Sequence, residues 1–350
     1  MRDLLPENRP LLILAPMQDI TDLPFWRVMS RYGGPDVYYT EYFRVHRDSR
    51  PEKHILRSIE ENPDGKPVIA QMIGQDLEAL RRTALELQKR KIAGIDINFG
   101  CPAPIVCKKD AGGGLLRHPE KIDDILREVR AAVHLRFTVK TRIGFDSPDE
   151  FPALLDLYRR HPIDALTVHG RTVREMYKPV LHHDAIERAA RLMPCPVLAN
   201  GNVRDVETAR HMVETTGARG LMIGRGAIRN PWLFNQIREA WITGEVRTRP
   251  TLVDLREYIE RLHEATHYPA MRDAGQVGKM KKYLGFIAPG IGPDENRDAF
   301  WNELKPALTL RDLFAICDRH LLSGGSASGL TPTDSIRDKP AGAPVGVPPH

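Results

Sequence analysis

The sequence predicts an α/β protein: a closed (β/α)8 TIM barrel followed by a smaller all-helical domain. Eight short apolar runs rich in β-branched residues recur along the chain, and most of the segments between them have helical spacing. No glycine-rich dinucleotide turn follows the first run. The runs span residues 11–16, 36–41, 68–74, 94–100, 137–144, 165–170, 196–201 and 220–226. Strands that alternate with helices form parallel sheets, and eight such units favour a closed barrel over an open sheet.

Helical spacing is clearest in two connecting segments. Apolar residues there recur on one face, at Leu77, Leu80, Ala84 and Leu87, and again at Ile122, Ile125, Leu126 and Val129. After Trp232 the strands stop while helical spacing continues. We therefore predict a barrel domain over residues 1–241 and a helical domain over 242–322. Residues 323–350 are predicted to be a disordered tail, because they lack the apolar content that offsets chain entropy.

Composition narrows the class of protein. A chain of 350 residues with 41% hydrophobic content can bury a sizeable core, and no run approaches the roughly 20 apolar residues of a membrane span. The first residues lack the features of a secretory signal, so we expect a cytoplasmic protein. The four cysteines, at 101, 107, 195 and 317, lack zinc-site or disulfide spacing, so we expect free thiols and no metal. A net charge of +5 permits a polyanionic partner without requiring one.

Polar or glycine-flanked residues end nearly every apolar run. In a barrel the carboxyl ends of all strands face one rim, where active sites of this fold are built. Residues that are distant in the sequence, such as Asn98, Lys140, His169 and Asn200, are therefore expected to converge at that rim.

The loop after the fourth run is the most distinctive stretch. The run breaks at Gly100, and Cys101 follows on a turn that Pro102 and Pro104 stiffen. A free cysteine is more often a small buried hydrophobe than a reagent. The three glycines at 112–114 change that balance, because consecutive glycines mark close approach of the backbone to something else. We interpret that neighbour as a ligand beside the cysteine loop.

Asn98-Phe-Gly-Cys-Pro, followed by Val106 and by Gly113-Gly-Leu-Leu, resembles the signature of the tRNA-dihydrouridine synthases. These flavin enzymes reduce a uridine in folded tRNA. The resemblance covers roughly residues 11–320. It implies FMN as cofactor, NADPH as electron donor and tRNA as partner, and we expect a monomer.

The resemblance also implies how the flavin is held. Lys140 lies on an otherwise apolar run, so its ammonium needs a partner at the strand end, either a carboxylate or a flavin. By the resemblance it stabilises negative charge near N1 and the C2 oxygen of the reduced ring. Pro16 and Met17 are then expected beneath the ring, Gln71 at its polar edge, and His169 near the ring and the phosphate.

Two strand ends are candidates for the phosphate site. Asn200, Gly201 and Asn202 follow the seventh run, and Gly224 and Arg225 follow the eighth. Glycine after a strand is also routine turn chemistry. Its occurrence at both of these neighbouring strands favours phosphate binding, which this fold commonly places there.

The implied reaction adds two hydrogens across the C5=C6 bond of uracil. Hydride from flavin N5 goes to C6, and Cys101 gives a proton to C5 as general acid. Asn98 and Arg142 are the leading candidates to bind the uracil, with Tyr177 third. Arg171 is a candidate contact to RNA phosphate.

A basic segment in the helical domain is expected to meet the tRNA backbone. Lys279, Lys281 and Lys282 would contact phosphates, while the apolar residues between them pack inward, namely Val277, Met280 and Leu284. The alternative is an ordinary solvated helix face. The segment 40–45 is most similar to the subgroup that modifies D-loop uridine 16, which gives an expectation for the target base.

The sequence leaves two alternative functions open. A flavin barrel acting on a free pyrimidine would need no basic helical appendage, and one type would need iron–sulfur cysteines that this chain lacks. An inactive RNA-binding barrel would not need Cys101 and Lys140. Flavin absorbance of the purified protein separates the enzyme hypotheses from the last one.

Overall fold

The computed structural model describes residues 1–322 and residue 330. The chain forms two compact units. The first comprises residues 1–23, 35–203 and 209–223, and the second comprises 24–34, 204–208 and the chain from 224 onward. The second unit includes residues 224–241, which were predicted to belong to the barrel domain. The predicted domain boundary stays a prediction, because the division into compact units does not show which part of the chain folds independently. Apart from residue 330, the predicted tail lies outside the described residues.

The first unit is a closed barrel of parallel strands. Its strands are β1 (Leu11–Leu14), β2 (Val37–Tyr39), β3 (Phe43–Val45), β4 (Val68–Gly74), β5 (Gly94–Phe99), β6 (Arg136–Arg142), β7 (Ala165–His169), β8 (Val197–Asn200) and β9 (Gly220–Ile223). β1 pairs with both β2 and β9, β2 pairs with β4, and β4 to β9 pair in sequence order. Eight strands therefore close a ring, which confirms the predicted barrel.

β3 is the strand that the sequence analysis missed. It pairs with the second half of β4, whereas β2 pairs with the first half. Between β2 and β3 the hydroxyl of Thr40 accepts the backbone N–H of Gln71 (3.0 Å). A side chain thus replaces a ladder hydrogen bond where the strand is interrupted.

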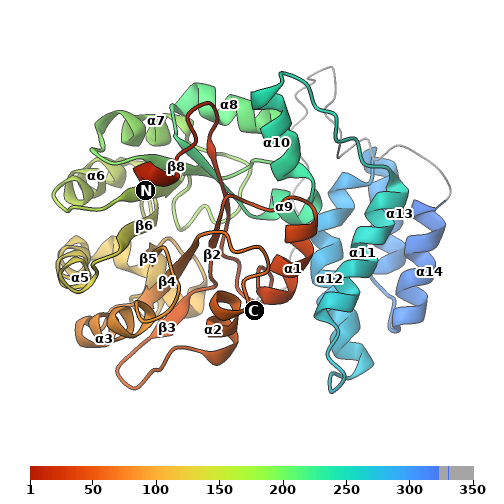
Figure 1. Cartoon of the computed structure of the whole chain (residues 1–350), viewed down its shortest axis with the longest axis horizontal. Coiled ribbons are helices and arrows are strands. Elements are labelled where there is room, and N and C mark those ends of the chain that lie inside the picture. Colours follow the sequence, from red (N-terminus) through yellow and green to blue (C-terminus); the bar gives the residue numbers. More distant parts are fainter. Residues whose placement is uncertain (323–329, 331–350) are drawn as a thin grey trace. The chain divides into compact units, whose positions relative to one another are not determined.

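Helices surround the strands of the first unit (Figure 1). They are α2 (Lys53–Glu60), α3 (Leu77–Leu87), α4 (Pro104–Cys107), α5 (Pro119–Ala132), α6 (Phe151–Arg159) and α7 (His183–Leu192), with α8 (Val206–Thr216) shared by the division into units and short turns η1 (Arg2–Leu4), η2 (Gly112–Arg117) and η3 (Pro148–Glu150). Both predicted apolar faces, on α3 and α5, are buried except for partly exposed Leu77. At the amino ends of the strands the interior is apolar, formed by Leu11, Ile13, Val37, Ile69, Leu198 and Met222 with Met1.

The second unit is helical. It contains α1 (Leu23–Arg31), α9 (Arg225–Arg229), α10 (Leu233–Ile242), α11 (Leu252–Thr266), α12 (Asp273–Ile287), η4 (Ala288–Gly290), α13 (Asp294–Leu304) and α14 (Leu310–Leu321). Within it α11 to α14 pack side by side (Figure 1). Val277, Met280 and Leu284 are buried, as predicted for the inner face of α12. None of the helices in the described part of the chain is long and apolar enough to cross a membrane.

Candidate active site

The register of the parallel strands brings most of the predicted site residues together. Residues paired across neighbouring strands point to the same face of the sheet. The pairs that matter are Gln71 with Asp96, Asp96 with Thr138, Asn98 with Lys140, Arg142 with His169, and His169 with Asn200. The polar residues therefore form rows across β4 to β8, at and towards the carboxyl ends of these strands, as predicted.

Asn98 holds the turn that carries Cys101. Its Oδ1 accepts the backbone N–H of Gly100 (2.8 Å) and that of Cys101 (2.9 Å). This is the local side-chain-to-backbone bonding by which asparagine stabilises turns. Asn98 is buried, and Cys101 is half-buried. The turn therefore leaves the Cys101 side chain half-exposed, while the Asn98 side chain fixes the backbone of the turn.

The three glycines approach the cysteine loop itself, which corrects the interpretation of a ligand there. A Cβ on Gly112 would lie 3.0 Å from Cys101 Cβ, and one on Gly113 would lie 2.8 Å from Cys101 O. One on Gly114 would lie 2.7 Å from Cys107 O. The Gly113 N–H donates to Cys101 O (3.0 Å), and the buried Cys107 thiol donates to the same oxygen (3.5 Å). Glycine is needed because this turn packs directly on the loop.

A chain of buried hydrogen bonds runs below Asn98. Asn98 Nδ2 donates to Gln71 Oε1 (2.8 Å), and Gln71 Nε2 donates to Asp96 Oδ2 (2.7 Å). Thr138 Oγ1 donates to Asp96 Oδ1 (2.6 Å). Asp96 is fully buried, and burial raises its pKa to about 6 despite the hydrogen bonds from Thr138 and Gln71. Neither Asp96 nor Thr138 was among the predicted site residues.

Lys140 is a cation without a hydrogen-bond or ion-pair partner among the described residues. Its pKa is lowered to about 8, mainly by burial and also by the neighbouring positive charge of Arg142, while the charge of Asp96 acts in the opposite direction. The carboxylate weighed as a partner in the sequence analysis is therefore not paired with it. An ammonium in this state favours an anionic or electron-rich ligand.

Arg142 supports two loops. Its Nε donates to Gly100 O (2.9 Å), and its Nη1 donates to Thr172 O (2.8 Å) and Met176 O (3.0 Å). Its guanidinium also lies over the ring of the half-exposed Tyr177, 5.9 Å from the centroid. Nη2 makes no hydrogen bond to any described residue, so it is the part of Arg142 that could bind a substrate.

His169 and Arg171 form a second polar cluster. Arg171 Nη1 lies 3.2 Å from His169 Nε2 and, because arginine only donates, that nitrogen accepts. Arg171 also donates to Lys178 O (2.7 Å) and to Asn202 Oδ1 (2.9 Å). Arg171 is fully buried, so the structure does not place it where an RNA backbone could reach it. It positions His169 and Asn202 instead.

The first unit contains only part of the predicted phosphate site, namely Asn200, Gly201 and Asn202. Asn200 donates to Met222 O (2.8 Å), and Gly201 (φ 131°) and Asn202 (φ 51°) have the left-handed backbone that glycine and asparagine tolerate. A Cβ on Gly201 would meet Leu181 at 2.6 Å. Gly224 and Arg225 begin α9 in the second unit, and their part in the site stays a prediction.

The turn after β1 carries Pro16 and Met17, both half-buried. Met17 N–H donates to Thr21 Oγ1 (2.7 Å). The next residue, Gln18, was not a predicted site residue. Both polar atoms of its amide are buried, and neither has a hydrogen-bond partner within the described part of the chain. Such orphaned groups normally find a partner, so this turn is suited to a polar ligand.

The basic segment lies on α12. Lys282 is exposed, whereas Lys279 and Lys281 are half-buried. Lys281 Nζ donates to Lys305 O (2.7 Å), at the end of α13. The structure therefore presents Lys282 most openly of the three and gives Lys281 a helix-capping contact.

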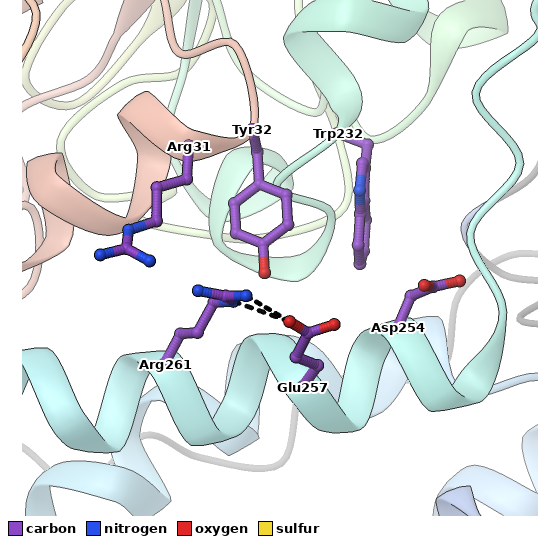
Figure 2. Close-up of a pocket in the computed structure, with 6 residues that line it drawn as sticks. All are labelled: Arg31, Tyr32, Trp232, Asp254, Glu257 and Arg261. Carbon is purple, nitrogen blue, oxygen red and sulfur yellow. Dashed lines mark hydrogen bonds and ion pairs between the residues drawn. The ribbon is translucent and has the colours of Figure 1, made fainter.

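The helical unit also contains a surface pocket of about 450 Å³. Figure 2 shows Tyr32 and Trp232 facing the α11 residues Asp254, Glu257 and Arg261. Arg261 Nε donates to Glu257 (3.1 Å), and Asp254 caps α11, so the charges on that wall are already engaged. None of the predicted site residues lines this pocket, and we assign it no function.

A closed (β/α)8 barrel that gathers a cysteine, a lysine and buried amides at the carboxyl ends of its strands defines the class: an enzyme of the TIM-barrel type. The family model described as dihydrouridine synthase (Dus) matches residues 13–315. The chain therefore belongs to the dihydrouridine synthase family.

Curated relatives agree. The "tRNA-dihydrouridine synthase B" of Pseudomonas putida is 35% identical over 291 residues, which cover 83% of this chain and 86% of that protein. The protein of the same name from Vibrio cholerae is 38% identical over 229 residues, covering 65% and 70%. A "Probable tRNA-dihydrouridine synthase" of Staphylococcus aureus is 36% identical over 235 residues, covering 65% and 71%.

Proposed function

We propose that this chain reduces the C5=C6 bond of uridines in tRNA to 5,6-dihydrouridine, with FMN as bound cofactor and NADPH as electron donor. Membership of the dihydrouridine synthase family and the names of its relatives support the reaction and the substrate. The observation that carries the proposal is the position of Asn98, which bonds the Cys101 N–H and pairs with Lys140 in the neighbouring strand. Asn98 thus links the turn that carries Cys101 to the strand position opposite Lys140, which supports a role for both side chains in one site.

The residues present fit a flavin. Among the residues that the structure describes, Lys140 has no hydrogen-bond or ion-pair partner, and the buried Gln18 amide makes no hydrogen bond. Lys140 would stabilise negative charge on the ring, while Pro16 and Met17 would lie beneath it. Asn200, Gly201 and Asn202, together with Gly224 and Arg225, would hold the phosphate. FMN held by these residues would supply the hydride chemistry that reduction of uracil requires.

The protein side chains provide the rest of the chemistry. Cys101 donates a proton from Sγ to C5 as the general acid. Asn98 Nδ2 uses one of its two hydrogens on Gln71, so the other is available to a uracil carbonyl. Arg142 Nη2 and the Tyr177 ring would complete the base site. Lys282 would contact the tRNA backbone, with Lys279 and Lys281 beside it.

The absorption spectrum of the purified protein tests the cofactor. We expect visible flavin absorbance, release of FMN on denaturation, and bleaching when NADPH is added without oxygen. A colourless protein that cannot be reconstituted with FMN would contradict the proposal.

A further inference from the structure

The buried hydrogen bonds below the cysteine turn have a fixed direction. An ionised aspartate only accepts hydrogen bonds, so Gln71 must turn its Nε2 towards Asp96 and its Oε1 towards Asn98. Asn98 must then present Nδ2 to Gln71 and Oδ1 to the turn. Each amide is oriented by the group beneath it.

The opposite orientation would disrupt the turn. If Gln71 were flipped, its NH2 would face the NH2 of Asn98. Asn98 would then have to flip as well, and its NH2 would face the N–H groups of Gly100 and Cys101. Both hydrogen bonds of the turn would be lost, which is unfavourable because the two N–H groups would stay buried and unpaired.

We propose that Asp96 is a positioning residue for the reaction: through Gln71 and Asn98 it fixes the backbone of the Cys101 turn, and its role is that of a hydrogen-bond acceptor. This inference rests on the proposed function for Cys101 but concerns a residue, Asp96, to which no contact with substrate or flavin is assigned. Asp96 is fully buried at 0% exposure, two hydrogen bonds from Asn98, and both of its oxygens are engaged.

Two substitutions separate the acceptor role from the charge. Asp96→Val places a residue of similar size that favours strands at this position but removes both acceptors. Asp96→Asn removes the charge but keeps one acceptor for Gln71, because Thr138 can turn its hydroxyl to accept from the new amide. Positioning therefore predicts loss in the Val variant and rescue in the Asn variant, whereas a role for negative charge beside Lys140 predicts loss in both.

The first readout is single-turnover dihydrouridine formation by the FMN holoenzyme. We expect Asp96→Val to lower its rate by about 10- to 100-fold, as removal of an outer supporting group commonly does. Asp96→Asn should stay close to wild type. Thr141→Val is the matched control: Thr141 is an equally buried residue of β6 whose hydroxyl bonds Tyr158 (2.9 Å), outside this chain of bonds.

The second readout does not depend on the reaction. Alkylation of Cys101 by iodoacetamide in flavin-free protein, corrected with a Cys101→Ala sample, should be several times faster in Asp96→Val than in wild type or Asp96→Asn, because the turn is released. If Asp96→Val does not fold, Gln71→Leu breaks the same chain and carries the same alkylation expectation.

The outcomes are distinguishable. Wild-type rate and alkylation in Asp96→Val, or in Gln71→Leu where that variant replaces it, would overturn the inference, and so would equal damage in Asp96→Asn. Wild-type holoenzyme that forms no dihydrouridine would overturn the proposed function instead, and the alkylation comparison would still decide whether Asp96 positions the turn.

Discussion

At the scale of single residues, Cys101 is the group on which the proposed chemistry depends. Cys101→Ala should retain FMN and tRNA binding but lose about 10²- to 10⁴-fold in dihydrouridine formation, the usual contribution of general acid catalysis. Flavin reduction by NADPH should not change. Cys195→Ala is the control, because Cys195 lies before β8, at the amino end of that strand. Near-normal single-turnover yield from Cys101→Ala would remove this cysteine from the mechanism.

Lys140 gives a prediction about the uptake of protons when FMN binds. Its pKa near 8 means that it is about half protonated at pH 8 in the flavin-free protein. An electron-rich flavin edge favours the charged form, so FMN binding should raise that pKa and take up protons at pH 8. Calorimetry of FMN binding in buffers of different ionisation enthalpy measures this uptake. Lys140→Met should abolish most of it; equal uptake by the variant would place the titrating group elsewhere.

Asp96 gives a prediction about stability. Its pKa is raised from an ordinary value of 3.8 to about 6, so the unfolded state binds fewer protons between these pH values and the Asp96 contribution to folding stability falls as pH rises from about 4 to 6. The cost at pH 7 is about 3 kcal/mol, at about 1.4 kcal/mol per pKa unit. Asp96→Asn should therefore gain stability relative to wild type between pH 4 and pH 7 in urea unfolding. A constant difference across this range would contradict the buried charge.

At the scale of elements, the turn η2 shapes the cysteine loop. A Cβ on Gly113 would lie 2.6 Å from Val173 and 2.8 Å from Cys101 O, and the latter is backbone that cannot move aside easily. Gly113→Ala should destabilise the protein by about 1–3 kcal/mol and impair dihydrouridine formation. Gly278→Ala, where a Cβ would meet nothing within 4 Å on α12, should instead stabilise by about 0.5–1 kcal/mol. Thermal unfolding of both variants checks this contrast.

Helix α12 carries one lysine that we expect to contact RNA, Lys282, and one that we expect to stabilise the protein, Lys281. Lys282→Ala should weaken tRNA binding and flatten its log–log salt dependence by roughly 0.7–0.9, because Lys282 is exposed. Lys281→Ala should mainly lower stability, because Lys281 caps α13 through Lys305 O. Titration with tRNA at two salt concentrations separates the two. Parallel titration curves for Lys282→Ala and wild type would mean that Lys282 does not contact the RNA.

At the scale of the whole molecule, the barrel was predictable because each buried parallel strand is a short apolar run between helical segments. The split into β2 and β3 was not, because it depends on the Thr40 hydroxyl replacing a ladder bond. Asp96 could have been found from the alternation of polar and apolar residues in β5. The orientations of the amides and the burial of Arg171 could not have been predicted from the sequence. A basic residue that follows a strand has the same sequence pattern whether its side chain turns inward or outward.

The most direct test of the account is the mass of the uridines in an unmodified tRNA transcript incubated with purified protein, FMN and NADPH. We predict that specific uridines gain the mass of two hydrogen atoms, and that omission of NADPH or of the protein prevents it. Flavin-loaded, NADPH-reduced protein that leaves every uridine unchanged across a full set of tRNA transcripts would contradict the central claim.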